Sequence, residues 1–276
     1  MTTMKRLELF EFEDFAWLPA WLRTAITNLI VVLHKVLGIS EILATLLAKL
    51  LQDQNQRQIV DLGSGSGGAM SAVLQALHTK EGMADVTLLL TDLHPNPDVV
   101  QRFNSTGDTS YRYLETALDA SDFATAPAGI KTMVNSFHHL PPEIAQRILQ
   151  SAQDNGETLL IYEMAENKAP VWAWALLLPI SIPFLMLQVI LMTPFVRPLH
   201  WWQLVFTYPI PLIPVVYAWD GLASTMRIYP EADVRTMLAA LEPTNEHYTW
   251  EIAAARKANG QKLGMYVLGR PSLQEV

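Results

Sequence analysis

The sequence predicts an α/β fold with a mostly parallel sheet, because short apolar runs alternate with helical patterns from residue 56 onward. The first run is followed by a glycine-rich loop, and apolar residues then recur at helical spacing over 69–77. Near the end of the chain, runs at 247–254 and 262–268 flank Asn259-Gly260, which is a hairpin turn signal. We therefore expect the sheet to close on an antiparallel strand pair.

The glycine-rich loop fits two ligand-binding patterns, and the acid before it separates them. Gly63-x-Gly65-x-x-Gly68 satisfies the dinucleotide fingerprint, which is weak when it stands alone. Asp61-x-Gly63-x-Gly65-x-Gly67 resembles the first motif of class I S-adenosylmethionine (SAM) methyltransferases. A carboxylate at the strand end repels a pyrophosphate, but it suits a cationic sulfonium and an amino group. SAM is therefore favoured over NAD, and a loop that only turns the chain is the structural alternative.

Later motifs extend this resemblance in the same chain order. The strand at 86–91 ends on Asp92, and the resemblance implies that this carboxylate accepts hydrogen bonds from the ribose hydroxyls of SAM. Asp119-Ala120, after a strand near 111–116, resembles the motif whose acid meets the adenine amino group. The structural alternatives are a helix cap at Asp92 and an ordinary polar loop at Asp119. The cofactor-binding residues that the resemblance implies are Asp61, Gly63, Gly65, Gly67, Asp92, Leu93, Asp119, Ala120 and Asn135.

The fourth strand, at 131–136, runs into the segment Phe137-His138-His139-Leu140-Pro141-Pro142-Glu143, which resembles the stretch after strand four in the same family. The residues expected to face the methyl group of SAM are Asn135, Ser136, His138 and His139, and Glu163 lies at the end of the fifth strand, at 158–162. Histidine titrates in the range that a general base needs, so the candidate catalytic group is His138, His139 and Glu163. The structural alternative for each histidine is a hydrogen bond that fixes the loop. No metal site is expected.

The composition changes between residues 169 and 219. Arg197 and His200 are its only Asp, Glu, Lys, Arg or His side chains, and the stretch holds five of the eight tryptophans and eight of the seventeen prolines. Residues 171–193 carry no charge and are long enough to cross a bilayer, although Pro179 and Pro183 each cost a helix interior ~3 kcal/mol. A single crossing would leave residues 220–276 on the wrong side of the bilayer, and the proline-rich run that follows is a poor return span.

We therefore expect this insertion to be a substrate lid that touches a membrane without spanning it. Its apolar side chains would form a largely dry pocket for an apolar substrate. The residues expected to line or orient the substrate are Trp17, Arg197, His200, Tyr208 and Asp220, for which core packing or lid anchoring is the structural alternative. A monotopic or dimer-forming patch is the other interpretation of the insertion.

The segment before the sheet is expected to be helical. Pro19 can open one helix that Gly38 ends, and Ser40 can cap a second. The predicted organisation is an N-terminal helical cap (1–55), an SAM-binding core (56–168), a hydrophobic insertion (169–219) and a C-terminal completion of the core (220–276). The resemblance implies a Rossmann-like, seven-stranded, mostly parallel sheet with an antiparallel last strand, N-terminal helices and a hydrophobic helical insertion.

The overall composition excludes several classes of function. A net charge of −8 argues against nucleic acid as a partner, because neutralising phosphates needs a basic surface. The absence of cysteine rules out disulfides and cysteine nucleophiles, and no apolar signal region follows the N-terminus, which agrees with a cytoplasmic protein that is soluble or peripheral at the inner membrane face. Mean hydropathy is high for a soluble protein, at +0.18.

The predicted function is methyl transfer from SAM to a lipophilic small molecule. The acceptor could be nitrogen, oxygen or carbon, and membrane-surface contact and a homodimer are expectations of the same reading. Two alternatives remain: an NAD(P)-linked oxidoreductase, and a membrane-associated SAM-binding protein without transfer activity.

Overall fold

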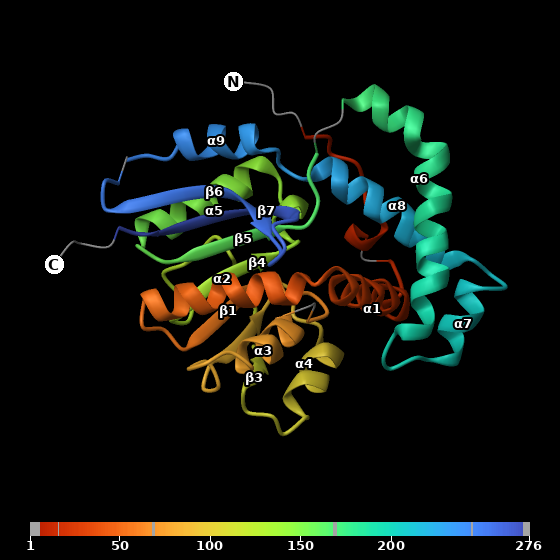
Figure 1. Ribbon diagram of the computed structural model, residues 1–276, viewed down its shortest axis with the longest axis horizontal. Helices are drawn as coiled ribbons and strands as arrows, with labels where there is room; N and C mark the ends of the chain where they lie inside the picture. Colours follow the sequence, from red (N-terminus) through yellow and green to blue (C-terminus); the bar gives the residue numbers. More distant parts are fainter. Residues whose placement is uncertain (1–5, 16, 68–69, 168–169, 244, 273–276) are drawn as a thin grey trace. The chain divides into compact units, whose positions relative to one another are not determined.

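The structure is a computed structural model that describes residues 6–15, 17–67, 70–167, 170–243 and 245–272. The chain divides into two compact units (Figure 1). Unit 1 contains Gly38–Ala165 and Glu231–Val276, and unit 2 contains Thr3–Leu37 and Glu166–Pro230. Unit 2 therefore joins segments that the sequence assigns to the N-terminal cap, the insertion and the start of the C-terminal part. The four-part division of the chain stays a prediction.

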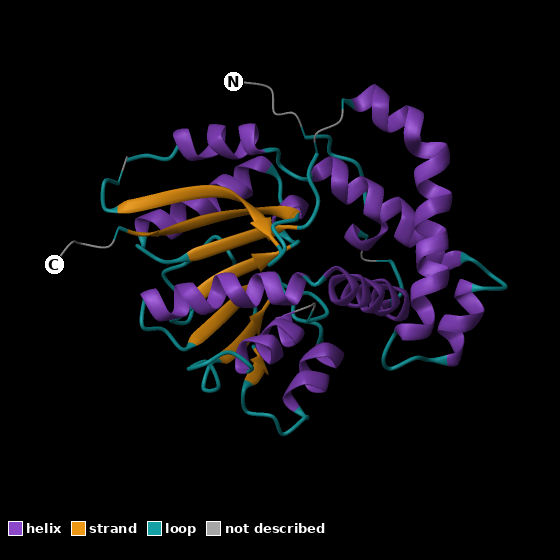
Figure 2. Ribbon diagram, in the orientation of Figure 1, coloured by secondary structure: helices purple, strands orange, loops and turns teal. Residues whose placement is uncertain are grey.

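Unit 1 is built on a seven-stranded sheet of order β3-β2-β1-β4-β5-β7-β6 (Figure 2). Strands β1 to β5 pair in parallel, whereas β7 pairs antiparallel with both β5 and β6. The mostly parallel sheet with an antiparallel closing pair is thus confirmed. The strands are β1 (Gln58–Leu62), β2 (Thr87–Thr91), β3 (Tyr111–Tyr113), β4 (Ile130–Val134), β5 (Leu159–Glu163), β6 (Tyr248–Arg256) and β7 (Lys262–Pro271).

Helices cover both faces of this sheet, as parallel sheets require. The helices α2 (Ile39–Asp53) and α3 (Met70–His78) pack together on one face, and α5 (Pro142–Asp154) and α9 (Glu231–Ala239) pack together on the other (Figure 1). The helix α4 (Pro97–Asn104) packs beside β3, and the Asn96 side chain caps it by accepting a hydrogen bond from the Asp98 N–H.

The boundary before α2 corrects one detail of the sequence analysis. Gly38 adopts a left-handed conformation with φ of 74°, and α2 begins directly after it at Ile39. Ser40 consequently lies inside the helix and does not cap it. Glycine reverses the chain here without a side-chain cap because it has no Cβ to clash.

Unit 2 is helical. Its elements are η1 (Phe12–Asp14), α1 (Ala20–Leu37), α6 (Val171–Met192), η3 (Thr193–Phe195), α7 (Trp201–Thr207) and α8 (Leu212–Arg227). One hydrophobic core joins the N-terminal helix of this unit to helices that follow much later in the sequence. It contains Leu22, Ile26 and Leu29 of α1, Val189 of α6 and Ile213 of α8. The helix α6 therefore buries mainly its C-terminal part.

The N-terminal segment of unit 2 is attached to α8 by charged groups. The Asp220 carboxylate accepts hydrogen bonds from the backbone N–H groups of Phe12 (2.7 Å) and Glu13 (3.3 Å). Arg227 pairs with Glu11 at 3.1 Å and with Asp14 at 2.6 Å, and both Arg227 and Glu11 are buried. These contacts fix the segment because a buried charge needs a paired partner.

The helix α6 continues through Pro179 and Pro183, although proline disfavours a helix interior. The two prolines are four residues apart, so they lie on the same side of the helix, and both are exposed. The carbonyl groups that lose their helical partners therefore face outward and not into the unit 2 core. This placement explains how one helix accommodates both residues.

Two helices of the described chain are long and apolar enough to cross a membrane: Ala20–Leu37, with a mean hydropathy of 1.3, and Trp172–Phe195, with a mean hydropathy of 2.3. They differ in burial, since 33% of the first span is buried and only 11% of the second. The first is accordingly a core helix of unit 2, whereas the second leaves most of its apolar surface uncovered.

Candidate active site

The candidate site lies at one edge of the unit 1 sheet, where the parallel strands have their carboxyl ends. Asp61 is the last residue but one of β1, and Glu163 is the last residue of β5. Asp92 directly follows β2, and Asn135 directly follows β4. In open α/β sheets ligands bind at this edge, at the point where the strand order reverses. That point here is between β1 and β4, so the sequence-predicted residues of unit 1 gather around it.

The glycine loop after β1 provides space for a ligand. Gly65 has φ of 53°, and a Cβ built on it would meet no atom within 4 Å. Gly67 has φ of 89°, and a Cβ there would lie 2.2 Å from the Phe103 ring of α4. The absence of a Cβ at Gly65 thus leaves open space beside the loop, whereas its absence at Gly67 lets the Phe103 ring pack directly against the loop. Gly68, the last glycine of the dinucleotide pattern, lies outside the described residues.

The Asp61 carboxylate is buried and held on both oxygens. Its Oδ1 accepts a hydrogen bond from the Thr132 hydroxyl (2.7 Å), and its Oδ2 accepts one from the Ser64 hydroxyl (2.7 Å). Thr132 reaches it because β1 and β4 pair with these two residues in register. Burial raises the pKa of Asp61 to about 6, although both hydroxyls act to lower it. A buried carboxylate of this kind gains from a cationic partner, which an amino group supplies.

Asp92 and Tyr113 hold the peptide groups of the glycine loop. The Asp92 Oδ2 accepts a hydrogen bond from the Gly65 N–H (2.8 Å), and the Tyr113 hydroxyl donates one to the Gly65 carbonyl (2.8 Å). The other Asp92 oxygen accepts from the His94 N–H at 2.8 Å. Burial, and then the nearby Asp92 charge, raises the pKa of Tyr113, so its hydroxyl stays a donor. Both Asp92 oxygens therefore accept backbone hydrogen bonds, and the role of Asp92 toward the ribose hydroxyls stays a prediction.

The remaining predicted cofactor residues lie on loops at the same edge. Leu93 is 49% exposed after β2, as an apolar contact for a flat ring would need. The Asp119 Oδ1 accepts hydrogen bonds from the Ser121 backbone and hydroxyl, which lower the pKa of Asp119, and Ala120 follows it in this loop. Asn135 adopts the left-handed conformation that is rare for residues other than glycine, with φ of 51°, and its Oδ1 accepts from the Met164 N–H (2.8 Å).

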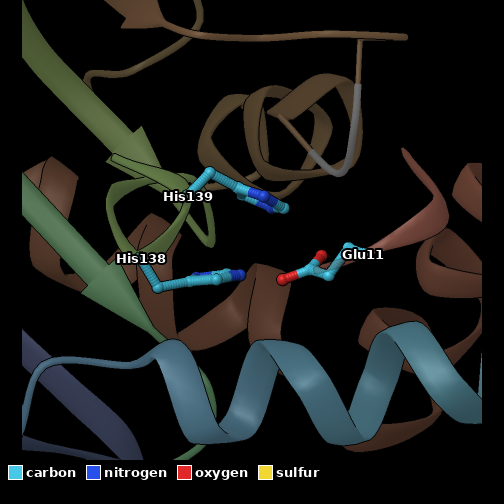
Figure 3. A group of neighbouring side chains, drawn as sticks. All are labelled: Glu11, His138 and His139. Atoms are coloured by element: carbon cyan, nitrogen blue, oxygen red, sulfur yellow. The ribbon is translucent and has the colours of Figure 1, made fainter. Parts of the chain in front are cut away.

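The predicted catalytic residues form a connected group. The Glu163 carboxylate accepts two hydrogen bonds from His138, one from its backbone N–H (3.0 Å) and one from Nδ1 (2.8 Å). Both residues are buried. The His139 ring packs on the His138 ring with their centroids 4.3 Å apart (Figure 3). They come from η2 (Phe137–His139) and from β5, and this brings an imidazole and its orienting carboxylate to the edge of the sheet.

This arrangement can hold one histidine tautomer. With an ionised Glu163, Nδ1 of His138 carries the hydrogen that is donated, and in the neutral ring Nε2 is then the acceptor nitrogen. A base and an orienting carboxylate in this geometry can take a proton from a bound nucleophile. Glu163 thus fixes the orientation of the His138 ring, and the catalytic role of the group stays a prediction.

The predicted substrate residues all belong to unit 2, and three of them bond to its backbone. Arg197 donates to the Pro194 and Val196 carbonyls, the Tyr208 hydroxyl donates to the Ile190 carbonyl, and Asp220 accepts from the N-terminal segment as described above. His200 stacks on Trp202 with centroids 5.5 Å apart, and Trp17 is 66% exposed and stacks on Phe15. Their role toward a substrate stays a prediction.

Sequence reasoning missed the residues that shape the loop from outside it. Thr132, Tyr113 and Phe103 are distant from the glycines in sequence and have no motif of their own. Ser136, one of the residues expected to face the methyl group of SAM, has a buried Oγ for which the described residues offer no hydrogen-bond partner. A Cβ on Gly63 would lie 3.8 Å from this Oγ, so the loops after β1 and β4 face each other here.

The strand order, the antiparallel β7 and the acid-plus-glycine loop after β1 define the class I methyltransferase fold. Comparisons with solved structures agree. The chain is similar to an O-methyltransferase family protein from Burkholderia thailandensis at 16% identity and a TM-score of 0.50, over 92% of this chain and 60% of that one. It is also similar to the plantazolicin methyltransferase BpumL, solved in complex with SAH, at 9% identity and a TM-score of 0.50, over 91% of this chain and 98% of that one.

The chain thus spans about three fifths of the Burkholderia protein but nearly all of BpumL. No protein-family model matches the sequence, and no curated protein matches it. At these identities the similarity establishes the fold.

Proposed function

We propose that this protein is an SAM-dependent methyltransferase that acts on a lipophilic small molecule. The observation that carries the proposal is the buried Asp61 carboxylate beside the open space at Gly65, at the switch point of the sheet. An anionic group there suits a cationic amino acid moiety and opposes a pyrophosphate. The structural relatives include an enzyme solved with SAH, which agrees with SAM as the cofactor.

The residues present fit SAM. Asp61 would pair with the amino group, Gly63, Gly65 and Gly67 would let the backbone approach the ligand, and Asp92 would accept the ribose hydroxyls. Leu93, Asp119 and Ala120 would contact the adenine, and Asn135 would close the pocket near the reacting centre. When bound, SAM supplies an electrophilic methyl group on a sulfonium sulfur.

The residues of the chain have two tasks in this proposal. They hold the acceptor in line with the methyl group, and positioning of this kind can supply much of the rate acceleration. If the acceptor is a hydroxyl or an ammonium group, His138 takes its proton at Nε2 while Glu163 holds the ring. His139 supports the His138 ring through the contact between the two tilted rings. If the acceptor is already a nucleophile, the same residues only position it.

The lipophilic acceptor is inferred from unit 2. The stretch between residues 169 and 219 contains two ionisable side chains of the Asp, Glu, Lys, Arg and His types, and an apolar pocket would suit an apolar substrate. Substrate orientation by Trp17, Arg197, His200, Tyr208 and Asp220, the lid role of the insertion, a cytoplasmic location and a homodimer belong to the same proposal.

Calorimetric titration with SAH and with NADH tests the cofactor. We expect SAH to bind and NADH not to bind. Asp92→Ala should weaken SAH binding by roughly 1–3 kcal/mol, the scale of lost charge-assisted hydrogen bonds. Binding of NADH would favour an NAD(P)-linked oxidoreductase. Unchanged SAH affinity in Asp92→Ala would count against the role of Asp92 in the cofactor site.

Methyl transfer is tested by incubating the protein with SAM labelled on its methyl group and with lipophilic cell extracts. Mass spectrometry should then find a labelled lipophilic product. With that acceptor in hand, His138→Ala should lower kcat by roughly 10²–10⁴-fold, the usual contribution of a general base. Glu163→Gln, which removes the orienting charge, should lower kcat by less and leave SAH affinity unchanged. Tight SAH binding with no labelled product would favour a SAM-binding protein without transfer activity.

A further inference from the structure

One side of α6 is apolar along its whole length and into η3. Six large side chains on this side are more than 60% exposed, and we call them the apolar stripe: Trp172, Leu176, Ile180, Phe184, Leu191 and Phe195. They recur mostly at four-residue spacing, which places them along one side of the helix. Soluble monomers rarely expose a contiguous apolar patch of this extent, so the stripe indicates a binding partner.

Lipid fits this surface better than another protein does. Every exposed residue between 172 and 195 is apolar, so the indole N–H of Trp172 is the sole side-chain hydrogen-bonding group among the exposed positions of this range. Protein interfaces carry about one hydrogen bond per 100–200 Å², together with a polar rim. Hydrocarbon requires neither. The composition of the stripe therefore favours acyl chains over a protein surface.

The residues at the ends of the stripe are of the types that membranes hold at their surface. Trp172 begins it with 70% exposure, and Trp201 and Tyr208, which follow it, are 75% and 45% exposed. Arg197 and His200 are exposed between Phe195 and Trp201, so Arg197 places a positive charge at this end of the stripe in a chain whose net charge is −8. Tryptophan and tyrosine prefer the level of the lipid headgroups, and arginine is attracted to their phosphates.

Chain connectivity decides how α6 meets the bilayer. The chain leaves unit 1 at Ala165 and re-enters it at Glu231, so a helix that crossed the bilayer would need a return crossing in between. The helices available for it, α7 and α8, have 7 and 16 residues, whereas a crossing takes about 20 apolar residues. In addition, α8 carries the buried Asp220 and ends at Arg227.

We propose that unit 2 docks on a lipid bilayer through the apolar stripe, with α6 lying in the plane of the membrane surface. Helices of this kind bury their apolar side at the boundary between headgroups and acyl chains. The proposal rests on unit 2 alone and holds whether or not the protein transfers methyl groups.

Vesicle binding by the full-length protein tests the proposal. We expect sedimentation with phosphatidylcholine vesicles that persists at high salt, and stronger binding when half of the lipid is phosphatidylglycerol. Ile180→Glu and Phe184→Glu should each lower the partition coefficient by roughly tenfold or more, because a charge replaces a buried apolar side chain. The matched control is Val36→Glu, which adds the same charge at an apolar residue of α1 that is 72% exposed and outside the stripe. Arg197→Gln should remove only the gain from phosphatidylglycerol.

The orientation of α6 is tested with a single fluorescent label, because the chain contains no cysteine. A polarity-sensitive dye on Ile180→Cys should brighten when vesicles are added, whereas the same dye on Val36→Cys should not. Nitroxide near the headgroups should quench the Ile180 label more strongly than nitroxide near the chain ends does. Stronger quenching from the chain ends would show a spanning helix and overturn the in-plane arrangement.

Three results would refute lipid docking: no vesicle binding, equal loss of binding in Val36→Glu, or binding that survives both stripe substitutions. If ultracentrifugation without lipid shows a dimer that Ile180→Glu dissociates, and vesicles do not bind, the stripe covers a second copy of the chain. Thermal unfolding of each variant checks that the fold is retained, and the exposed positions of the substitutions make a change in stability small.

Discussion

Burial and hydrogen bonding act in opposite directions on the pKa of Asp61. This residue is buried, which disfavours its charge, yet two hydroxyls are directed at its oxygens. The result is a pKa raised from 3.8 to about 6. The folded chain therefore holds a proton that the unfolded chain has already released between these two values. The stability from this group is complete below pH 3.8 and is lost as the pH rises through about 6.

The same pKa predicts a pH dependence of SAH binding. The amino group of SAH pairs with the ionised carboxylate, so affinity should rise between pH 5 and pH 7 as Asp61 loses its proton. Near pH 6 binding should release a proton, which calorimetry in two buffers of different ionisation enthalpy measures. Asp61→Asn should bind weakly and release none. Proton uptake on binding, or the same release in the variant, would contradict the pairing.

At the scale of elements, the glycine loop is held by its neighbours as much as by its own sequence. Tyr113 of β3 and Asp92 after β2 bond the Gly65 peptide groups, and Phe103 of α4 fills the space under Gly67. Two substitutions of equal size can therefore separate the loop's two functions, which are to leave space for the ligand and to pack on α4.

We expect Gly65→Ala to lower stability by about 1 kcal/mol, through its left-handed backbone, while it strongly weakens SAH binding. Gly67→Ala should lower stability by about 2 kcal/mol or more, because its Cβ also meets the Phe103 ring. Denaturant unfolding and SAH titration of both variants provide the measurements. If Gly65→Ala binds SAH normally, the open space at this residue is not the ligand site.

The sequence predicted the features that depend on local patterns. The strands and the Asn259-Gly260 hairpin follow from periodicity and turn chemistry, and each is found in the structure. The contact of Asp61 with Thr132 spans 71 residues and that of Tyr113 with Gly65 spans 48, and both depend on strand register, which no single segment encodes. The length of α6 was obscured by its two prolines, because local propensity cannot show that both face outward.

At the scale of the whole molecule, the grouping of segments into units was beyond the reach of local patterns. The helix α1 looks like a neighbour of α2 in sequence, yet it shares its core with α6 and α8. Removal of the insertion would therefore expose the α1 core, so single substitutions are the better probe of its role.

The stability of unit 2 should depend on the ion pairs of Arg227. Arg227→Met leaves the buried Glu11 carboxylate without this partner, which should lower the free energy of unfolding by about 3–5 kcal/mol. Glu11→Gln in the same chain should restore part of the loss, since it removes the negative charge of this buried side chain. Thermal unfolding of the two single variants and the double variant measures this coupling. Equal and additive losses would show that the pair does not interact.

The anchoring of residues 6–15 on α8 also bears on how the protein is made. Phe12 and its partner Asp220 are 208 residues apart, so residues 6–15 leave the ribosome long before α8 and cannot dock until α8 has been made. Until then the apolar side of α1 has no cover on the nascent chain. The packing of residues 6–37 is thus completed only after α8 is made, while Gly38–Ala165 can already assemble most of the unit 1 sheet. During translation, α1 is therefore an apolar target for a chaperone until α6 and α8 have been made.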